Sequence, residues 1–204
     1  MNPELVSSFL VASVLLTLMP GPDNLFVLAQ SLSRGAKTGI AISLGLVLGV
    51  IVHTSLAATG LTLILKQSEW AFNGIKYLGA AYLFYLAYQA SQEVPLELKT
   101  NESVHSKSVF QWIHKGFFMN VLNPKVSLFF IAFLPRFIDP FGISTTYQLF
   151  LMGFIFMVQA FVIFSIIASL AGRLTSVLNS SQFWQITKIV KVIVLLVLGL
   201  FLLF

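Results

Sequence analysis

Two charged side chains in this chain each follow a proline inside a long apolar stretch. Asp23 stands in Pro20-Gly21-Pro22-Asp23-Asn24, and Lys125 stands in Asn123-Pro124-Lys125. An ionisable group deep in an apolar segment is costly and therefore a functional candidate by default. Proline breaks helices, and breaks at matching places in two halves of a chain point to the binding site of a transporter. The two motifs predict one site near the middle of a membrane.

The charges at these breaks suit the two ends of a zwitterion. The Asp23 carboxylate could hold an ammonium group or a proton, and the amino end of the half-helix beginning there could hold a carboxylate. Alternatively, Asp23 only caps that half-helix. Lys125 could form a gated ion pair with Asp23 or anchor a substrate carboxylate. Alternatively, the pair is static and joins the two halves of the protein.

Five polar side chains are further candidates for substrate or proton binding: Asn24, His53, Asn120, Asn123 and Gln159. Asn120 and Asn123 could line the substrate pathway or satisfy backbone carbonyls freed by the breaks, and Asn24 could bind the substrate or act only as a local turn partner. His53 could relay protons because imidazole titrates near neutral pH, or it could bond a neighbouring carbonyl. Gln159 is more typical of a hydrogen bond between helices.

The composition is that of an integral membrane protein. The 204 residues are 57% hydrophobic and only 9% charged, with a mean hydropathy of +0.92, whereas a soluble domain has about a quarter of its residues charged. The net charge of +5 comes from basic residues scattered between apolar segments, which favours a lipid bilayer over nucleic acid as the partner. The chain has no cysteine, and no phosphate loop or zinc-binding helix motif, so no cofactor and no metal site are expected.

Because a span needs about 20 apolar residues, the sequence predicts an all-α protein with about six transmembrane helices. They are expected at 4–33, 39–65, 70–90, 115–136, 146–172 and 184–204. Helices 1 and 4 are expected to be broken, at Pro20-Gly21-Pro22 and at Asn123-Pro124. The last segment spans only if Lys188 and Lys191 extend toward the membrane surface.

A polar linker at 91–113 divides the single domain 1–204 into halves at 1–90 and 114–204. Three spans in each half would make the halves inverted with respect to one another. Eight Lys and Arg residues fall in the connections on one side and three on the other. Since cytoplasmic loops carry the excess of basic residues, the 91–113 loop is expected in the cytoplasm. Gly45 and Gly49 share one face with His53 and predict close helix packing, within the chain or in a homodimer.

These motifs together resemble the LysE/RhtB translocators, which are bacterial amino-acid exporters. The resemblance covers about Phe9 to Phe204. It rests on five features: Pro20-Gly21-Pro22-Asp23, Arg34-Gly35, the spacing of Gly45, Gly49 and His53, Asn123-Pro124-Lys125, and Phe129–Pro135. It implies a multi-pass protein of the inner (plasma) membrane that exports homoserine, threonine, homoserine lactone, leucine or basic amino acids. The resemblance implies that the membrane potential or a proton gradient drives this export.

Proton antiport is our expectation for the driving force, because the chain lacks a nucleotide-binding motif and Asp23 could carry a proton across. Two other classes of protein fit the sequence less well. An intramembrane enzyme would need a nucleophile or a metal-binding set near Asp23 and His53, and the sequence offers no second deep acid to pair with Asp23. A non-transporting scaffold or a channel would have no reason to bury Asp23 and Lys125 at helix breaks.

Overall fold

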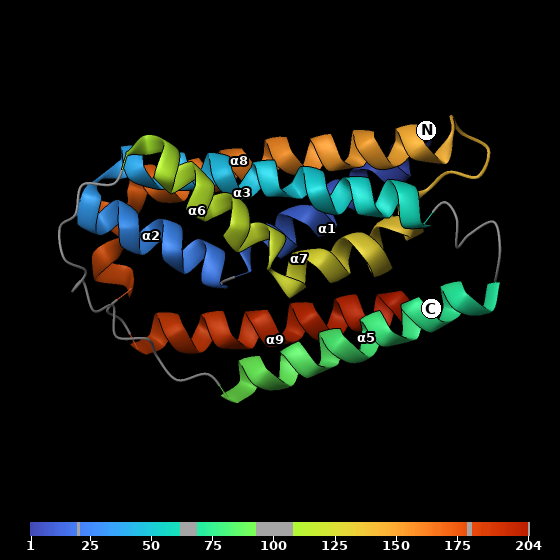
Figure 1. The fold of residues 1–204 in the computed structure, drawn as a ribbon. Coiled ribbons are helices and arrows are strands. Elements are labelled where there is room, and N and C mark those ends of the chain that lie inside the picture. Colours follow the sequence, from blue (N-terminus) through green and yellow to red (C-terminus); the bar gives the residue numbers. More distant parts are fainter. Residues whose placement is uncertain (20, 62–68, 93–107, 179–180, 204) are drawn as a thin grey trace.

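The computed structural model describes residues 1–19, 21–61, 69–92, 108–178 and 181–203, and in these ranges all regular structure is helical (Figure 1). The all-α prediction is therefore confirmed for the described part of the chain. The α-helices are α1 (Pro3–Leu18), α2 (Pro22–Arg34), α3 (Ala36–Leu56), α5 (Glu69–Gln92), α6 (Val109–Val121), α7 (Pro124–Leu128), α8 (Thr145–Leu178) and α9 (Ser181–Leu203). Short π and 3-10 helices extend two of them: η1 (Ala57–Leu61) after α3, and η2 (Phe129–Phe133) and η3 (Leu134–Phe137) after α7.

Local sequence explains where several helices begin. The Asn2 side chain caps α1 by accepting a hydrogen bond from the Glu4 amide at 2.9 Å. Ser108 and Gln111 form a capping box at the start of α6. Pro22 and Pro124 are the first residues of α2 and α7, a position where the missing N–H of proline is harmless. Each proline therefore starts a helix a few residues after the preceding one ends, at Leu18 for α1 and at Val121 for α6.

Length and composition mark three described helical segments as candidate membrane spans: Ala36–Gly60, Thr145–Ala171 and Trp184–Leu203. Two bent pairs raise the number to five if each pair is one span. These are α1 with α2, bent by 56°, and α6 with Pro124–Phe137, bent by 51°. The predicted segment 70–90 lies in α5, where polar residues such as Asn73, Lys76 and Gln89 dilute the apolar run, and α5 is not among the candidates. The described residues thus give three to five spans, and the arrangement of six spans in inverted halves stays a prediction.

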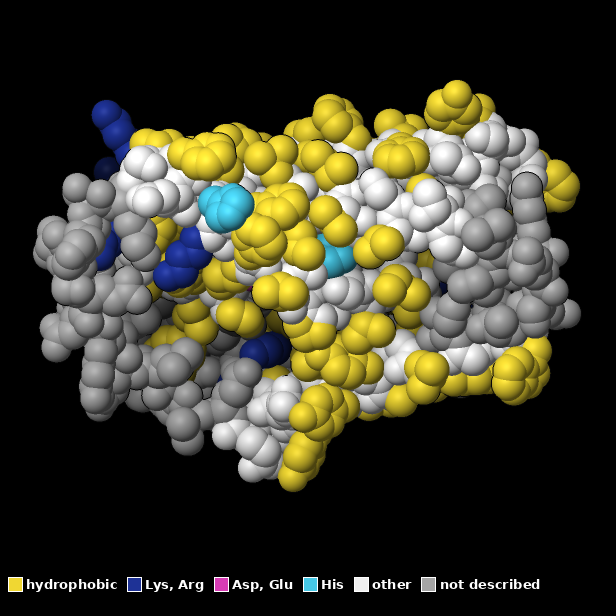
Figure 2. Space-filling view, viewed as in Figure 1, with side chains coloured by type: hydrophobic (Ala, Val, Ile, Leu, Met, Phe, Trp, Pro, Cys, Tyr) yellow, Lys and Arg dark blue, Asp and Glu magenta, His cyan; other side chains and the backbone are white. Residues whose placement is uncertain are grey.

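The helices run roughly along one long direction, in two groups (Figure 1). In the larger group, α3 packs extensively against α6 and α8, and α2 and α1 pack on α8. In the smaller group, α5 pairs with α9 and meets the rest mainly through η2. Figure 2 shows a face whose middle is covered mostly by hydrophobic side chains, with most of the visible Lys and Arg side chains toward one end. Such a surface fits a lipid bilayer around the middle of the molecule.

Glycines bring the backbones of α3 and α6 into contact. A Cβ atom added at Gly45 would overlap the Ile113 carbonyl oxygen, and one added at Gly116 would overlap that of Ile42. At Gly49 an added Cβ would lie 2.8 Å from Cβ and Oδ1 of Asn120. The Gly45 and Gly49 face therefore packs against α6 inside the chain, and the possible homodimer stays a prediction.

We expect Gly45→Ala to lower the melting temperature of the detergent-solubilised protein, because the new methyl group must push α6 away from α3. Overpacking of this kind costs about 1–3 kcal/mol. Gly74→Ala in α5 is the matched control, since its Cβ would meet no atom within 4 Å, and it should leave the melting temperature unchanged or slightly raised. Equal melting curves for Gly45→Ala and the wild type would contradict the close packing.

Aromatic side chains fix the second broken segment against the rest of the protein. The Phe129 ring lies 6.0 Å from that of Phe9 on α1 and 5.2 Å from that of Phe133. The Phe130 ring lies 5.2 Å from that of Phe156 on α8, edge to face. These contacts hold η2, which directly follows α7, against α1 and α8.

Candidate functional site

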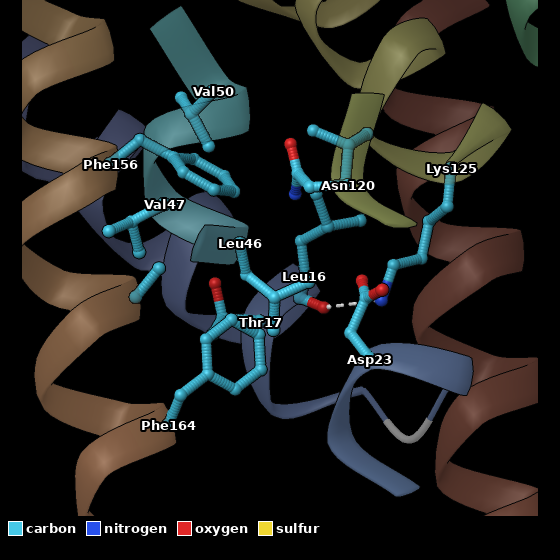
Figure 3. Close-up of a pocket in the computed structure, with 12 residues that line it drawn as sticks. Leu16, Thr17, Asp23, Leu46, Val47, Val50, Asn120, Lys125, Phe156 and Phe164 are labelled. Atoms are coloured by element: carbon cyan, nitrogen blue, oxygen red, sulfur yellow. Dashed lines mark hydrogen bonds between the residues drawn. The ribbon is translucent and has the colours of Figure 1, made fainter. Parts of the chain in front are cut away.

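The two breaks in the helices face one another across a small buried cavity (Figure 3). Asp23 from the first break is only 2% exposed, and Asn120, just before the second, is 3% exposed. The lining side chains are Leu16, Thr17, Asp23, Leu46, Val47, Val50, Asn120, Lys125, Val126, Phe156, Ala160 and Phe164. The cavity has room for about one water molecule.

Lys125 closes the broken end of α1. Its ammonium group donates hydrogen bonds to the carbonyl oxygens of Leu16 at 3.3 Å and Met19 at 3.5 Å. In an unbroken helix the Leu16 carbonyl would accept from residue 20, which is a proline and has no N–H. The carboxyl end of a helix also attracts positive charge. Lys125 thus replaces donors that the break removes.

Glycine at position 21 leaves the space that this contact needs. A Cβ atom added at Gly21 would lie 3.3 Å from the Lys125 ammonium nitrogen. A larger side chain there would compete directly with the lysine. Gly21, the residue just before α2, therefore leaves room for the cation.

Polar side chains from α2 and α8 cover the same end of α1. The Asn24 amide donates to the Thr17 carbonyl at 2.8 Å. The Gln159 amide donates to the Thr17 hydroxyl at 3.0 Å and to the Ser13 carbonyl at 3.4 Å. Gln159 therefore makes the hydrogen bond between helices that its position suggested, and Asn24 satisfies a freed backbone carbonyl.

Asn123 joins the two breaks directly. Its side-chain oxygen accepts from the Lys125 backbone amide at 3.0 Å and so caps α7, while its side-chain amide donates to Asp23 Oδ2 at 2.5 Å. Among the described residues Asp23 Oδ1 has no hydrogen-bond partner and Oδ2 accepts from Asn123, so the structure shows no capping bond from Asp23 to α2. One residue thus caps the second half-helix and holds the carboxylate beside the first.

The direct ion pair that we expected between Asp23 and Lys125 is not formed. Among the described residues the one ion pair within 4.0 Å joins the amino group of Met1 to Asp139, at 3.9 Å. Asp23 instead binds Asn123, and Lys125 binds backbone carbonyls. Both charges nevertheless line one cavity, and in Figure 3 their head groups point toward the same end of it.

His53, 4% exposed on α3, lies behind the Asn120 backbone and does not line the cavity. Its Nε2 is 3.1 Å from the backbone carbonyl oxygen of Asn120, which also accepts from the backbone N–H of Asn123 at 2.8 Å. Because a carbonyl oxygen only accepts, Nε2 carries the proton in this contact. Of the two interpretations of His53, the structure shows the bond to a carbonyl, and a role in moving protons stays a prediction.

Four buried acceptor oxygens near the cavity have no hydrogen-bond donor among the residues that the structure describes: Asp23 Oδ1, Asn24 Oδ1, Asn120 Oδ1 and Gln159 Oε1. A buried acceptor left unpaired costs about 1–3 kcal/mol. Those of Asp23 and Asn120 belong to side chains that line the cavity, and Asn24 and Gln159 both bond Thr17, which lines it too. The site therefore favours a ligand that donates several hydrogen bonds, such as an ammonium group.

The structure thus gathers most of the predicted site residues around one space. Asp23, Asn120 and Lys125 line the cavity. Asn24, Asn123 and Gln159 form hydrogen bonds to residues that line it. Pro20 lies outside the described residues. Sequence reasoning missed the apolar wall. The repeat of Phe156, Ala160 and Phe164 at every fourth residue places them on one face of a helix, which is the signal that could have found it.

The fold and the site define a helical membrane protein with a buried, charged cavity between two broken helices. Residues 14–204 match the family described as LysE type translocator, and the chain belongs to this family. The resemblance noted from the motifs is confirmed. The protein is accordingly a transporter and not an enzyme.

Several curated proteins are similar to this chain. An uncharacterized membrane protein of Pseudomonas aeruginosa is 39% identical over 137 residues, which are 65% of this chain and 63% of that protein. The leucine efflux protein of Salmonella typhimurium is 32% identical over 147 residues, 72% of this chain and 69% of that protein. An uncharacterized membrane protein of Vibrio cholerae is 33% identical over 134 residues, 65% of this chain and 64% of that protein. The match thus spans somewhat less than two thirds of the Pseudomonas and Vibrio proteins. No solved structure matches the chain significantly.

Proposed function

We propose that this protein exports amino acids from the cytoplasm, by opening the cavity between the two helix breaks to each side of the membrane in turn. The observation that carries the proposal is that both breaks bring a charge to one buried cavity, Asp23 from the first and Lys125 from the second. Membership of the translocator family and similarity to a leucine efflux protein support an amino acid as the substrate.

The chemistry of the cavity matches the two charged groups of an amino acid. An ammonium group carries a positive charge and three donors, which suit the Asp23 carboxylate and its unpaired Oδ1. A carboxylate would suit the ammonium group of Lys125, which now holds backbone carbonyls at 3.3 and 3.5 Å. Binding would thus exchange weak contacts of Lys125 for a charged partner.

The packing between the two halves supports alternating access. In inverted repeats of three spans, α3 corresponds to α8 and α5 to α9, and these corresponding helices lie against each other in the structure. Movement of one half against the other would then open the cavity first to one side and then to the other. Proton antiport, with Asp23 as the carrier, is the coupling that we propose.

We propose the bacterial inner membrane as the location, with the 91–113 loop in the cytoplasm. Eight Lys and Arg residues fall in the connections on the side of this loop and three on the other, and this excess supports the orientation. Arg34 and Lys115 both lie over the Trp112 ring, at 5.3 and 5.8 Å. At the other end, Lys76 and Arg136 donate to the last carbonyls of α9, those of Leu203 at 3.1 Å and Leu202 at 3.2 Å.

We expect a cysteine introduced at Ser103 to be protected from an impermeant thiol reagent added to intact cells, and a cysteine at Ser68 to be labelled. The chain has no cysteine of its own, so each variant reports a single position. Permeabilised cells supply the control, because both sites should react there. Labelling of Ser103→Cys alone in intact cells would show that the orientation is inverted.

Efflux from preloaded proteoliposomes tests the proposed function. Vesicles containing purified protein and a labelled amino acid, drawn from a panel of neutral, basic and acidic ones, should release at least one of them faster than empty vesicles do. Unlabelled amino acid outside should accelerate the release by exchange, which separates a transporter from a channel. No release of any amino acid on the panel would overturn the proposal.

A further inference from the structure

The cavity has two chemically different ends, as Figure 3 shows. Asp23, Asn120 and Lys125 gather at one end. At the other end lie Phe156 and Phe164 from α8, with Val47 from α3. The charged end is built on the two broken pairs of helices, and the apolar end on two continuous helices.

We propose that the apolar end receives the side chain of the transported amino acid and restricts transport to amino acids with uncharged, apolar side chains. This inference rests on the proposed function. The ammonium and carboxylate groups of the substrate are common to all amino acids and are bound at the end with Asp23 and Lys125. Selection between amino acids then depends on the wall formed by α3 and α8.

Amino acids with a charged side chain are excluded because the apolar end offers no partner for that charge. Asp23 is the one acidic residue among the side chains that line the cavity, and Lys125 is the one basic residue. The substrate's own ammonium and carboxylate groups take up both. A lysine or glutamate side chain would place a second charge against phenylalanine, valine and alanine, where an unpaired charge is costly to bury.

A hydroxyl group on the side chain is a weaker obstacle than a charge. An apolar pocket cannot strongly reject a substrate that adds only a hydroxyl to a side chain of similar shape. Free threonine should therefore compete for the site less well than free valine, but measurably. Free lysine and glutamate should hardly compete at all.

Ala160 sets the depth of the apolar end. It lies one helical turn from Phe156 and one from Phe164, on the same face of α8. It is 1% exposed and is the smallest side chain on this wall. A larger residue at this position would fill the space between the two rings, so its size is expected to limit the substrate side chain.

The experiment measures how unlabelled amino acids inhibit uptake of labelled leucine into leucine-loaded proteoliposomes. For the wild type we expect leucine and valine to compete at least about tenfold better than lysine or glutamate. Ala160→Leu should weaken competition by free leucine at least about tenfold more than competition by free alanine, since the added side chain occupies the space of the larger substrate. Phe164→Ala should do the opposite and improve competition by phenylalanine relative to leucine.

Val158→Leu is the control variant, because it adds the same kind of bulk on the half-exposed outer side of α8 and should leave the order of competition unchanged. Melting curves of all variants show whether each protein is folded. Competition by lysine as strong as that by leucine would overturn the inference and leave amino-acid export standing. An equal loss for every amino acid in folded Ala160→Leu, with no change of preference in Phe164→Ala, would overturn it too. Absence of any amino-acid transport would overturn the proposed function as well.

Discussion

Replacing Lys125 with Met is expected to abolish export and to lower the free energy of unfolding in detergent by about 1–3 kcal/mol for each buried carbonyl that loses its donor. The substitution keeps most of the side-chain volume. It removes the hydrogen bonds to Leu16 and Met19 and leaves Asp23 in a cavity without a cation. Denaturant unfolding and vesicle efflux measure the two effects.

Lys37→Met is the control for the loss of a positive charge, since Lys37 is exposed at the start of α3, and it should change neither stability nor export substantially. A double-mutant cycle with Asp23→Asn tests whether the two buried charges act together. We expect the double variant to be more stable than the sum of the single effects, by more than about 0.5 kcal/mol. Strict additivity would mean that Asp23 and Lys125 occupy the cavity independently.

Lys125 binds backbone carbonyls and not the carboxylate that the sequence suggested, because a search for partners among side chains alone overlooks the backbone. Asp23 is the deep acid in the sequence, so elimination among side chains selects it as the partner. The structure satisfies Lys125 with backbone carbonyls instead. One of these acceptors was nevertheless implied by the sequence, because a proline at position 20 leaves the carbonyl of residue 16 without its helical donor. In a membrane, where water does not replace lost donors, this carbonyl needs another partner.

The positions of helices were more predictable than the faces they bury. Apolar length and proline act locally, and the described helices α2 and α7 begin at Pro22 and Pro124. A buried face and a lipid-exposed face of a membrane helix are both apolar, so periodicity does not separate them as it does in water. Phe156, Ala160 and Phe164 line the cavity while Phe154 and Val158 on the same helix are exposed, and only the tertiary packing distinguishes the two sets.

Acidifying the outside of vesicles at a clamped membrane potential is expected to accelerate export by the wild type, and Asp23→Asn is expected to lose this acceleration together with active export. Export against a gradient needs a source of energy, and the chain has no nucleotide-binding motif. Asp23 Oδ1 lies buried without a hydrogen-bond donor, so it can accept a proton when the cavity opens to the acidic side. It would release the proton when the cavity opens to the cytoplasm.

Asparagine at position 23 tests this role with little change of shape, because its amide oxygen can still accept the hydrogen bond from Asn123. The variant should keep slow exchange of substrate down its gradient. Glu4→Gln is the control for the loss of an acid, since Glu4 is exposed in the first turn of α1, and it should retain the full response to pH. His53→Gln separates a relay from a carrier: a partial loss of the response would place His53 on the proton path beside Asp23. If wild-type export ignores the imposed pH gradient, proton antiport is wrong, and Asp23 acts only as a ligand for the ammonium group of the substrate.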